Sequence, residues 1–189
     1  RREFVEAVGA GLLIGLVAGP AEAQTRGALE SRLHLAEDGT VTIFTGKVEV
    51  GQGSRVELAM AAAEEMRLPV ERVRMVMADT ERTPNDGTTA GSRTTPATVP
   101  TVRSAAAAAR ELLLEAASRH WQLERGRLAV RDGAVIDPAG NRRFGYAELA
   151  RTPELAGAYK TALPAGAALT PVKEWRLLGT PRYRLDGRD

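Results

Sequence analysis

The sequence predicts a mixed α/β (α+β) domain. Three observations support this prediction: a strand, helix and strand pattern in the first half of the chain, a long alanine-rich helical stretch in the middle, and a hairpin signal after it. The chain has 189 residues, of which 43% are hydrophobic and 26% charged, so it can bury a core as one ordinary domain or two small ones.

The first unit is a strand, a helix and a second strand. Residues 39–46 alternate apolar and polar side chains, which predicts a strand. Residues 54–66 place apolar side chains at helical spacing and leave Glu64 off that stripe, and residues 72–78 predict a second strand. Because the helix between them is short, we expect the two strands to be parallel.

The middle of the chain differs from the first half in composition. Residues 79–101 are rich in Thr, Gly, Pro and Asp and have almost no large apolar side chain. Loops this long are usually functional or disordered. Residues 102–121 predict a helix of about twenty residues whose Ala and Leu repeat leaves Arg103 and Arg110 outward.

The last third is predicted to contain a hairpin and an extended segment. Turn residues Asp132 and Gly133 separate two short apolar runs and favour a β-hairpin. Residues 145–150 predict one or two helical turns. Residues 156–189, with three prolines, indicate an extended connector.

The N-terminal stretch RREFVEAVGAGLLIGLVAGPAEA, residues 1–23, is predicted to be a signal peptide. Arg1 and Arg2 precede an apolar stretch at 8–19, and Ala-Glu-Ala at 21–23 suits a cleavage site. The double arginine resembles a twin-arginine signal, so we expect export to the periplasm without an integral membrane span. An amphipathic N-terminal helix is the alternative. We also expect the chain to be a piece of a longer reading frame.

Composition excludes several functions. The 26 Lys and Arg nearly balance the 24 Asp and Glu, which argues against a nucleic-acid-binding face. The chain has no Cys, so it holds no disulfide and no Cys-ligated cluster, and with two histidines we expect no metal ligands from this chain. His120 is expected at a helix end.

The segment GKVEVGQGS, residues 46–54, places Gly51, Gln52 and Gly53 where a strand leads into a helix. Such a turn can offer backbone N–H groups to a phosphate, or it can merely permit a tight turn with Gln52 in solvent. Neither nucleotide-binding motif is complete. A second loop, AGSRTTP at 90–96, again precedes a helix. If both loops face the same side, they form a polar cradle for a phosphate-bearing ligand with amide-like edges.

Residues 46–114 resemble a molybdopterin-binding segment of the xanthine dehydrogenase and aldehyde oxidase family, the molybdenum hydroxylases. Within that family, the order of a twin-arginine leader followed by such a segment most resembles the large subunits of enzymes like isoquinoline 1-oxidoreductase. The resemblance implies a molybdopterin-binding-type domain at 24–155 and a connector at 156–189 toward a hammerhead-like domain missing from the chain. It implies cofactor contacts from Gly51, Gln52, Gly53, Gly91, Ser92, Arg93, Thr94 and Thr95.

The resemblance also implies cofactors and partners. We expect a molybdenum–molybdopterin cofactor in its cytosine dinucleotide form, iron–sulfur clusters on a small partner subunit, contact with the remainder of the large subunit, and a small-molecule substrate, either an N-heterocycle or an aldehyde. The catalytic glutamate of the family lies in a C-terminal segment outside this chain, and Glu49 and Glu57 are expected to be solvated, so no catalytic residue is assigned. The alternative is a degenerate, non-catalytic copy with a structural or subunit-docking role.

Overall fold

A computed structural model describes residues 11–15, 31–158 and 167–183. A four-stranded sheet lies at its centre, in the order β1-β2-β3-β4. Its first three strands are antiparallel neighbours, whereas β3 and β4 are parallel. The strands are β1 (Gly11–Gly15), β2 (Ser31–Ala36), β3 (Val41–Thr45) and β4 (Val73–Met77).

The predicted strand, helix and strand unit is confirmed. Helix α2 (Ser54–Met66) has the bounds that its apolar spacing predicts, and β4 lies within the predicted range. β3 and β4 pair in parallel from Val41 with Val73 to Thr45 with Met77, as expected. The chain leaves α2 through Arg67, which has a left-handed backbone, and the short 3-10 helix η2 (Val70–Arg72) leads into β4.

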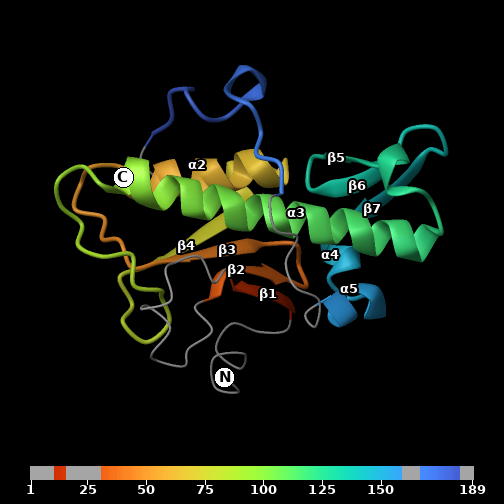
Figure 1. The fold of residues 1–189 in the computed structure, drawn as a ribbon, viewed down its shortest axis with the longest axis horizontal. Helices are drawn as coiled ribbons and strands as arrows, with labels where there is room; N and C mark the ends of the chain where they lie inside the picture. Colours follow the sequence, from red (N-terminus) through yellow and green to blue (C-terminus); the bar gives the residue numbers. More distant parts are fainter. Residues whose placement is uncertain (1–10, 16–30, 159–166, 184–189) are drawn as a thin grey trace.

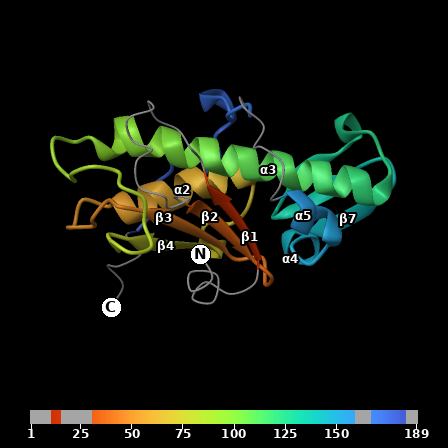
Figure 2. The ribbon, with the colours of Figure 1, turned by 60° about the horizontal axis from the view of Figure 1, so that its bottom comes forward.

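The long alanine-rich helix is also confirmed. α3 (Val99–Trp121) begins three residues before the predicted start and follows a short π-helix, η3 (Thr94–Thr98). Figures 1 and 2 show α2 and α3 side by side on one face of the sheet. Small side chains such as Ala106 and Ala109, both fully buried, let the two helices approach closely.

A second sheet lies at the far end of α3. The predicted hairpin is confirmed: β5 (Ala129–Arg131) and β6 (Ala134–Asp137) are joined through Asp132 and Gly133, whose φ angles of 48° and 65° fit a two-residue hairpin turn. The third strand of this second sheet, β7 (Arg142–Gly145), was not predicted from the sequence. The remaining elements here are η4 (Arg125–Arg127), α4 (Tyr146–Leu149) and α5 (Pro153–Ala158). His120 lies at the end of α3, as expected.

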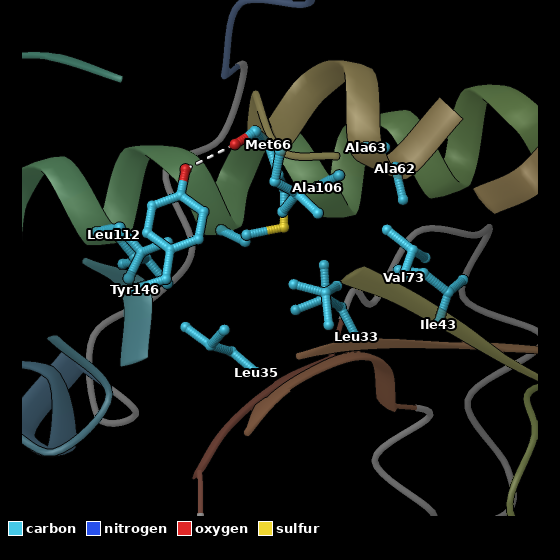
Figure 3. Packing of buried hydrophobic residues seen from close by; sticks show 14 of the residues in the cluster. Leu33, Leu35, Ile43, Ala62, Ala63, Met66, Val73, Ala106, Leu112 and Tyr146 are labelled. Atoms are coloured by element: carbon cyan, nitrogen blue, oxygen red, sulfur yellow. Dashed lines mark hydrogen bonds between the residues drawn. The ribbon is translucent and has the colours of Figure 1, made fainter. Parts of the chain in front are cut away.

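The main core lies between the large sheet and the two helices. Leu33 and Ile43 from the sheet face Met66 and Leu112 from the helices, and all four are buried (Figure 3). The hydroxyl of buried Tyr146 donates to the Met66 carbonyl oxygen at 2.7 Å. Burial raises the pKa of this hydroxyl, which therefore stays a neutral donor. Tyr146 thus ties the second sheet to the end of α2.

Residues 167–183 of the predicted connector pack back onto the domain. They contain the 3-10 helix η5 (Val172–Glu174) and lie beside α2 in Figure 1, where they are blue. Glu64, expected off the packed stripe, is 2% exposed. Its Oε2 accepts three consecutive backbone N–H groups, those of Arg176, Leu177 and Leu178, at 2.6–3.0 Å. The expectation for Glu64 was wrong because a segment more than a hundred residues later covers it.

Arg103 and Arg110 are not outward, contrary to the sequence-based expectation. The carboxylate of Glu65, which is fully buried, accepts from Arg103 Nε at 2.9 Å and from Arg110 Nη1 at 3.1 Å. The Arg103 guanidinium also lies 5.1 Å from the ring centre of Trp175. These cations face a buried carboxylate and the C-terminal segment, which the periodicity of α3 alone does not reveal.

The predicted leader is only partly described. Its residues 11–15 form β1, which pairs with β2, while Arg1 and Arg2 lie outside the described residues. Within the described part of the chain, no helix is both long and apolar enough to cross a bilayer.

Candidate functional site

The two loops singled out by the sequence lie at the same end of the molecule. The first, residues 46–53, connects β3 to α2. The second, AGSRTTP at 90–96, ends a loop that runs over residues 78–93 from β4, and its last three residues begin η3, which leads into α3. Residues 78–93 are called the second loop from here on. Because β3 and β4 are parallel and both helices cover one face, both loops leave the carboxyl ends of the strands (Figure 1). Ligands of open α/β sheets bind outside this edge. The geometric condition for a shared polar cradle is therefore met.

Hydrogen bonds join the two loops directly. The Val48 N–H donates to Thr89 Oγ1 at 2.9 Å. The Thr95 hydroxyl donates to Glu57 Oε1 at 2.7 Å, which links η3, directly after the second loop, to the first turn of α2. Glu57 is therefore not the plain solvated carboxylate that its helical position suggests.

Asp86, in the second loop, binds the end of β3 and the start of the first loop. Its carboxylate accepts two hydrogen bonds from the Arg32 guanidinium, each at 2.7 Å, and further bonds from the Thr45 hydroxyl at 2.5 Å and the Gly46 N–H at 3.0 Å. Burial raises the pKa of Asp86, but Arg32 and the other donors outweigh it and hold the pKa below its usual value. No local pattern in the sequence reveals this pair, because 54 positions separate its members.

Lys47 adds a second link between the loops. It is 2% exposed, and its ammonium donates to the Thr88 carbonyl oxygen at 2.9 Å and to the Gly87 carbonyl oxygen at 3.4 Å. A buried lysine needs such acceptors, since an unpaired buried charge is costly. Lys47 therefore fixes the first loop against the backbone of the second.

The turn at Gly51 and Gly53 has its backbone donors satisfied within the loop. Both glycines have positive φ angles, 100° and 82°, which side chains rarely tolerate. Glu49 Oε1 accepts the N–H groups of Gly51 at 2.8 Å and Gly53 at 3.0 Å, and its Oε2 accepts from the Arg55 N–H at 2.8 Å and the Ser54 hydroxyl at 3.2 Å. Of the two interpretations of this turn, the geometry favours the tight turn over a phosphate on these N–H groups.

Gln52 is exposed, yet its side chain is engaged with the loop. Its Oε1 accepts from the Val50 N–H at 2.7 Å and its Nε2 donates to the Val48 carbonyl oxygen at 2.9 Å. A carboxamide has two N–H donors and two acceptor lone pairs, so one donor and one acceptor remain for a ligand. The structure thus shows an oriented Gln52 side chain and not the solvated one of the tight-turn alternative.

Glu49 departs from the expectation of a plain solvated carboxylate. Burial raises its pKa, but the N–H groups of Arg55, Gly53 and Gly51 together outweigh burial, and the net pKa lies below the usual value. Glu49 is therefore an anion at neutral pH. A carboxylate just before a helix start is a known stabilising pattern, and that signal was present in the sequence.

The second loop presents donors of a different kind. Gly91 and Ser92 both have positive φ angles, 60° and 55°, and Gly91, Ser92 and Arg93 are exposed. The loop continues through half-buried Thr94 into η3. The Ser92 hydroxyl and the Arg93 guanidinium are donors suited to an anion such as a phosphate. This donor set fits the phosphate-bearing part of a molybdopterin cofactor, whereas Gln52 fits an uncharged polar edge.

The two loops do not form a metal centre of their own. Within residues 11–15, 31–158 and 167–183, no group of three or more His, Cys, Asp or Glu side chains is placed to hold a metal ion.

The fold and the paired loops define a ligand-binding α/β domain. The family model of the molybdopterin cofactor-binding domain matches residues 2–181. The chain belongs to this family, and the resemblance to the molybdenum hydroxylases is confirmed.

Curated relatives support the same family. A nicotinate dehydrogenase subunit from Pseudomonas putida is 35% identical over 152 residues, which cover 80% of this chain and 12% of the relative. The beta subunit of isoquinoline 1-oxidoreductase from Brevundimonas diminuta is 30% identical over 145 residues, covering 73% of this chain and 19% of the relative. The chain thus spans less than a fifth of the length of either relative.

A solved structure shows the same fold. The CO dehydrogenase from Oligotropha carboxidovorans superposes with a TM-score of 0.57 at 21% identity, covering 72% of this chain and 17% of that chain.

Proposed function

We propose that this chain is a cofactor-binding part of a molybdenum-dependent oxidoreductase. The two loops at the carboxyl ends of β3 and β4 contact the molybdopterin cofactor, and the cofactor supplies the oxidation and reduction chemistry when it is bound. One observation carries this proposal: hydrogen bonds from Val48 to Thr89 and from the Lys47 ammonium to the Thr88 carbonyl oxygen join the two loops to each other.

The proposed contacts divide between the loops. Gln52 uses its remaining donor and acceptor on a polar edge of the cofactor, while Gly51 and Gly53 let the backbone come close. Gly91 shapes the second loop, and the donors of Ser92, Arg93, Thr94 and Thr95 lie in or beside it, where they receive the phosphate and pterin portions. The general base of the reaction belongs to another segment of the complete protein.

The wider assembly follows from the same family. We propose the cytosine dinucleotide form of the cofactor, iron–sulfur clusters on a small partner subunit, an N-heterocycle or an aldehyde as substrate, and twin-arginine export to the periplasm. The names of the relatives, which include a nicotinate dehydrogenase and an isoquinoline oxidoreductase, support the N-heterocycle class.

Substitutions in the complete protein test the proposal. Gln52→Ala and Arg93→Ala each leave ligand groups unpaired, which costs about 1–3 kcal/mol, or roughly one to two orders of magnitude in cofactor retention. Bound molybdenum per protein chain and cytidine monophosphate released on hydrolysis are measured beside the melting temperature. Arg151→Ala, an exposed arginine after α4, is the matched control. Full molybdenum in folded Gln52→Ala and Arg93→Ala proteins contradicts the proposal.

A second candidate is a degenerate, non-catalytic copy of the domain with a structural or docking role. Glu49 favours this candidate, because its carboxylate already occupies the N–H groups at the start of α2. Such a copy predicts a different order of effects: Gly53→Val lowers the melting temperature, since φ at Gly53 is 82°, while Gln52→Ala leaves molybdenum unchanged. In the complete reading frame, the number of Gly-Gln-Gly turns and a C-terminal glutamate motif separate the two candidates as well.

A further inference from the structure

Glu49 and Gln52 belong to one hydrogen-bonded unit. We propose that Glu49 is a positioning residue: its carboxylate is a resident anion that closes the start of α2 and fixes the orientation in which Gln52 meets the ligand. This inference rests on the proposed function for its ligand, but its structural part can be tested separately.

The carboxylate of Glu49 is saturated by its own loop. Each of its two oxygens accepts two hydrogen bonds, at 2.8–3.2 Å, from Gly51, Gly53, Ser54 and Arg55. A carboxylate has about four lone-pair sites, so no acceptor site of Glu49 is left for substrate or cofactor. Its task is therefore to hold the loop and not to exchange a proton.

The same bonds hold the backbone on both sides of Gln52. Gly51 and Gly53 flank it, and both donate to the single oxygen Oε1 of Glu49. With the turn fixed in this way, the carboxamide of Gln52 bridges the backbone of Val48 and Val50. Loss of the Glu49 carboxylate removes this acceptor from both glycine N–H groups and with it the support for the orientation of Gln52.

The resident charge also determines where an anion binds. A helix N-terminus carries roughly half a positive charge and attracts phosphates. At α2 this attraction is already satisfied by Glu49, so a second anion there meets a negative carboxylate and donors that are occupied. The anionic part of the ligand is directed to the second loop, where Ser92 and Arg93 are exposed. The first loop then selects an uncharged polar edge.

Chemical rescue tests the proposal. In the complete protein, Glu49→Ala leaves four hydrogen-bond donors without their acceptor, and we expect a lower melting temperature and a roughly tenfold loss of bound molybdenum. Added acetate, a free carboxylate, should accept from these donors. The melting temperature and the molybdenum content should then rise with the acetate concentration. Glu49→Gln keeps the volume filled but turns an amide N–H toward N–H donors, so acetate should not restore it. Glu81→Ala removes an exposed carboxylate and should respond to acetate as wild type does.

The outcomes separate this inference from the proposed function. If Gln52→Ala and Arg93→Ala lose molybdenum while Glu49→Ala keeps it at the wild-type melting temperature, the role of Glu49 is refuted and the proposed function stands. If none of the three variants loses molybdenum but acetate still stabilises Glu49→Ala, the proposed function fails and the structural role of Glu49 stands. A loss in Glu49→Ala that acetate does not reverse overturns the resident-anion role.

Discussion

The carboxylate of Glu65 accepts hydrogen bonds at Oε2 from both the N–H and the hydroxyl of Thr170, at 3.0 and 2.9 Å, although 105 positions separate the two residues. Arg103 and Arg110 neutralise the same carboxylate. This cluster attaches residues 167–183 to α2 and α3, so the C-terminal segment is part of the domain's packing and not only a tether.

Glu65→Ala should destabilise the domain strongly. It leaves Arg103 and Arg110 without their buried partner, and breaking a buried ion pair costs about 3–5 kcal/mol. Glu115→Ala is the control, since Glu115 pairs with Arg119 on the exposed surface of α3 and such pairs contribute about 0.3–0.5 kcal/mol. Urea denaturation of the complete protein measures both. Equal effects of the two substitutions would show that the Glu65 cluster does not hold the C-terminal segment.

Gly46→Ala should separate the two loops. A Cβ at Gly46 would clash with the Pro84 carbonyl oxygen, a backbone atom that cannot move alone. We expect a loss of about 1–3 kcal/mol, as for other overpacking changes, together with reduced cofactor retention. Gly126→Ala is the control, because a Cβ there meets no atom within 4 Å. Melting temperature and molybdenum content report the two effects, and a Gly46→Ala protein that matches Gly126→Ala in both contradicts this close approach.

Asp86 should make stability depend on acid pH. Its folded pKa lies below the usual 3.8, so its ion pair with Arg32 stabilises the domain above that value and is lost as pH falls through the folded pKa. Asp86→Asn removes this titration. The difference in unfolding free energy between wild type and Asp86→Asn should be largest near neutral pH and shrink below the usual pKa. A difference for Asp86→Asn that does not change with pH would disprove the prediction.

The N-terminal leader stays a prediction with a direct test. Replacing Arg1 and Arg2 by Lys should keep a full-length precursor in the cytoplasm, because the twin-arginine route requires both arginines. Cell fractionation measures this, and normal export of the double-Lys protein argues for the alternative amphipathic helix. Cleavage after Ala23 would also remove β1, which pairs with β2, so the mature protein should expose the edge of β2 to another strand.

Local pattern was sufficient for much of the fold. The bounds of α2, the parallel pairing of β3 and β4 and the hairpin at Asp132 follow from apolar spacing and turn residues, which act over a few neighbouring positions. β1, β2 and β7 were not predicted, because strands gain much of their stability from partners across the sheet, which the local pattern does not reveal.

For the candidate site, residue types were enough to identify the loops that carry the glycines and hydroxyl groups, because Gly51, Gln52 and Ser92 stand out beside helix starts. What those loops contact became visible only in the folded chain. Asp86 pairs with Arg32 across 54 positions, because hydrogen bonds depend on distances that folding sets between residues far apart in sequence. The contacts of Glu49 are local, and its place just before the start of α2 is visible in the sequence. The burial of Glu64 and Glu65 has the same origin: Leu177 and Thr170, which bond to them, lie more than a hundred positions later, beyond the reach of any local pattern.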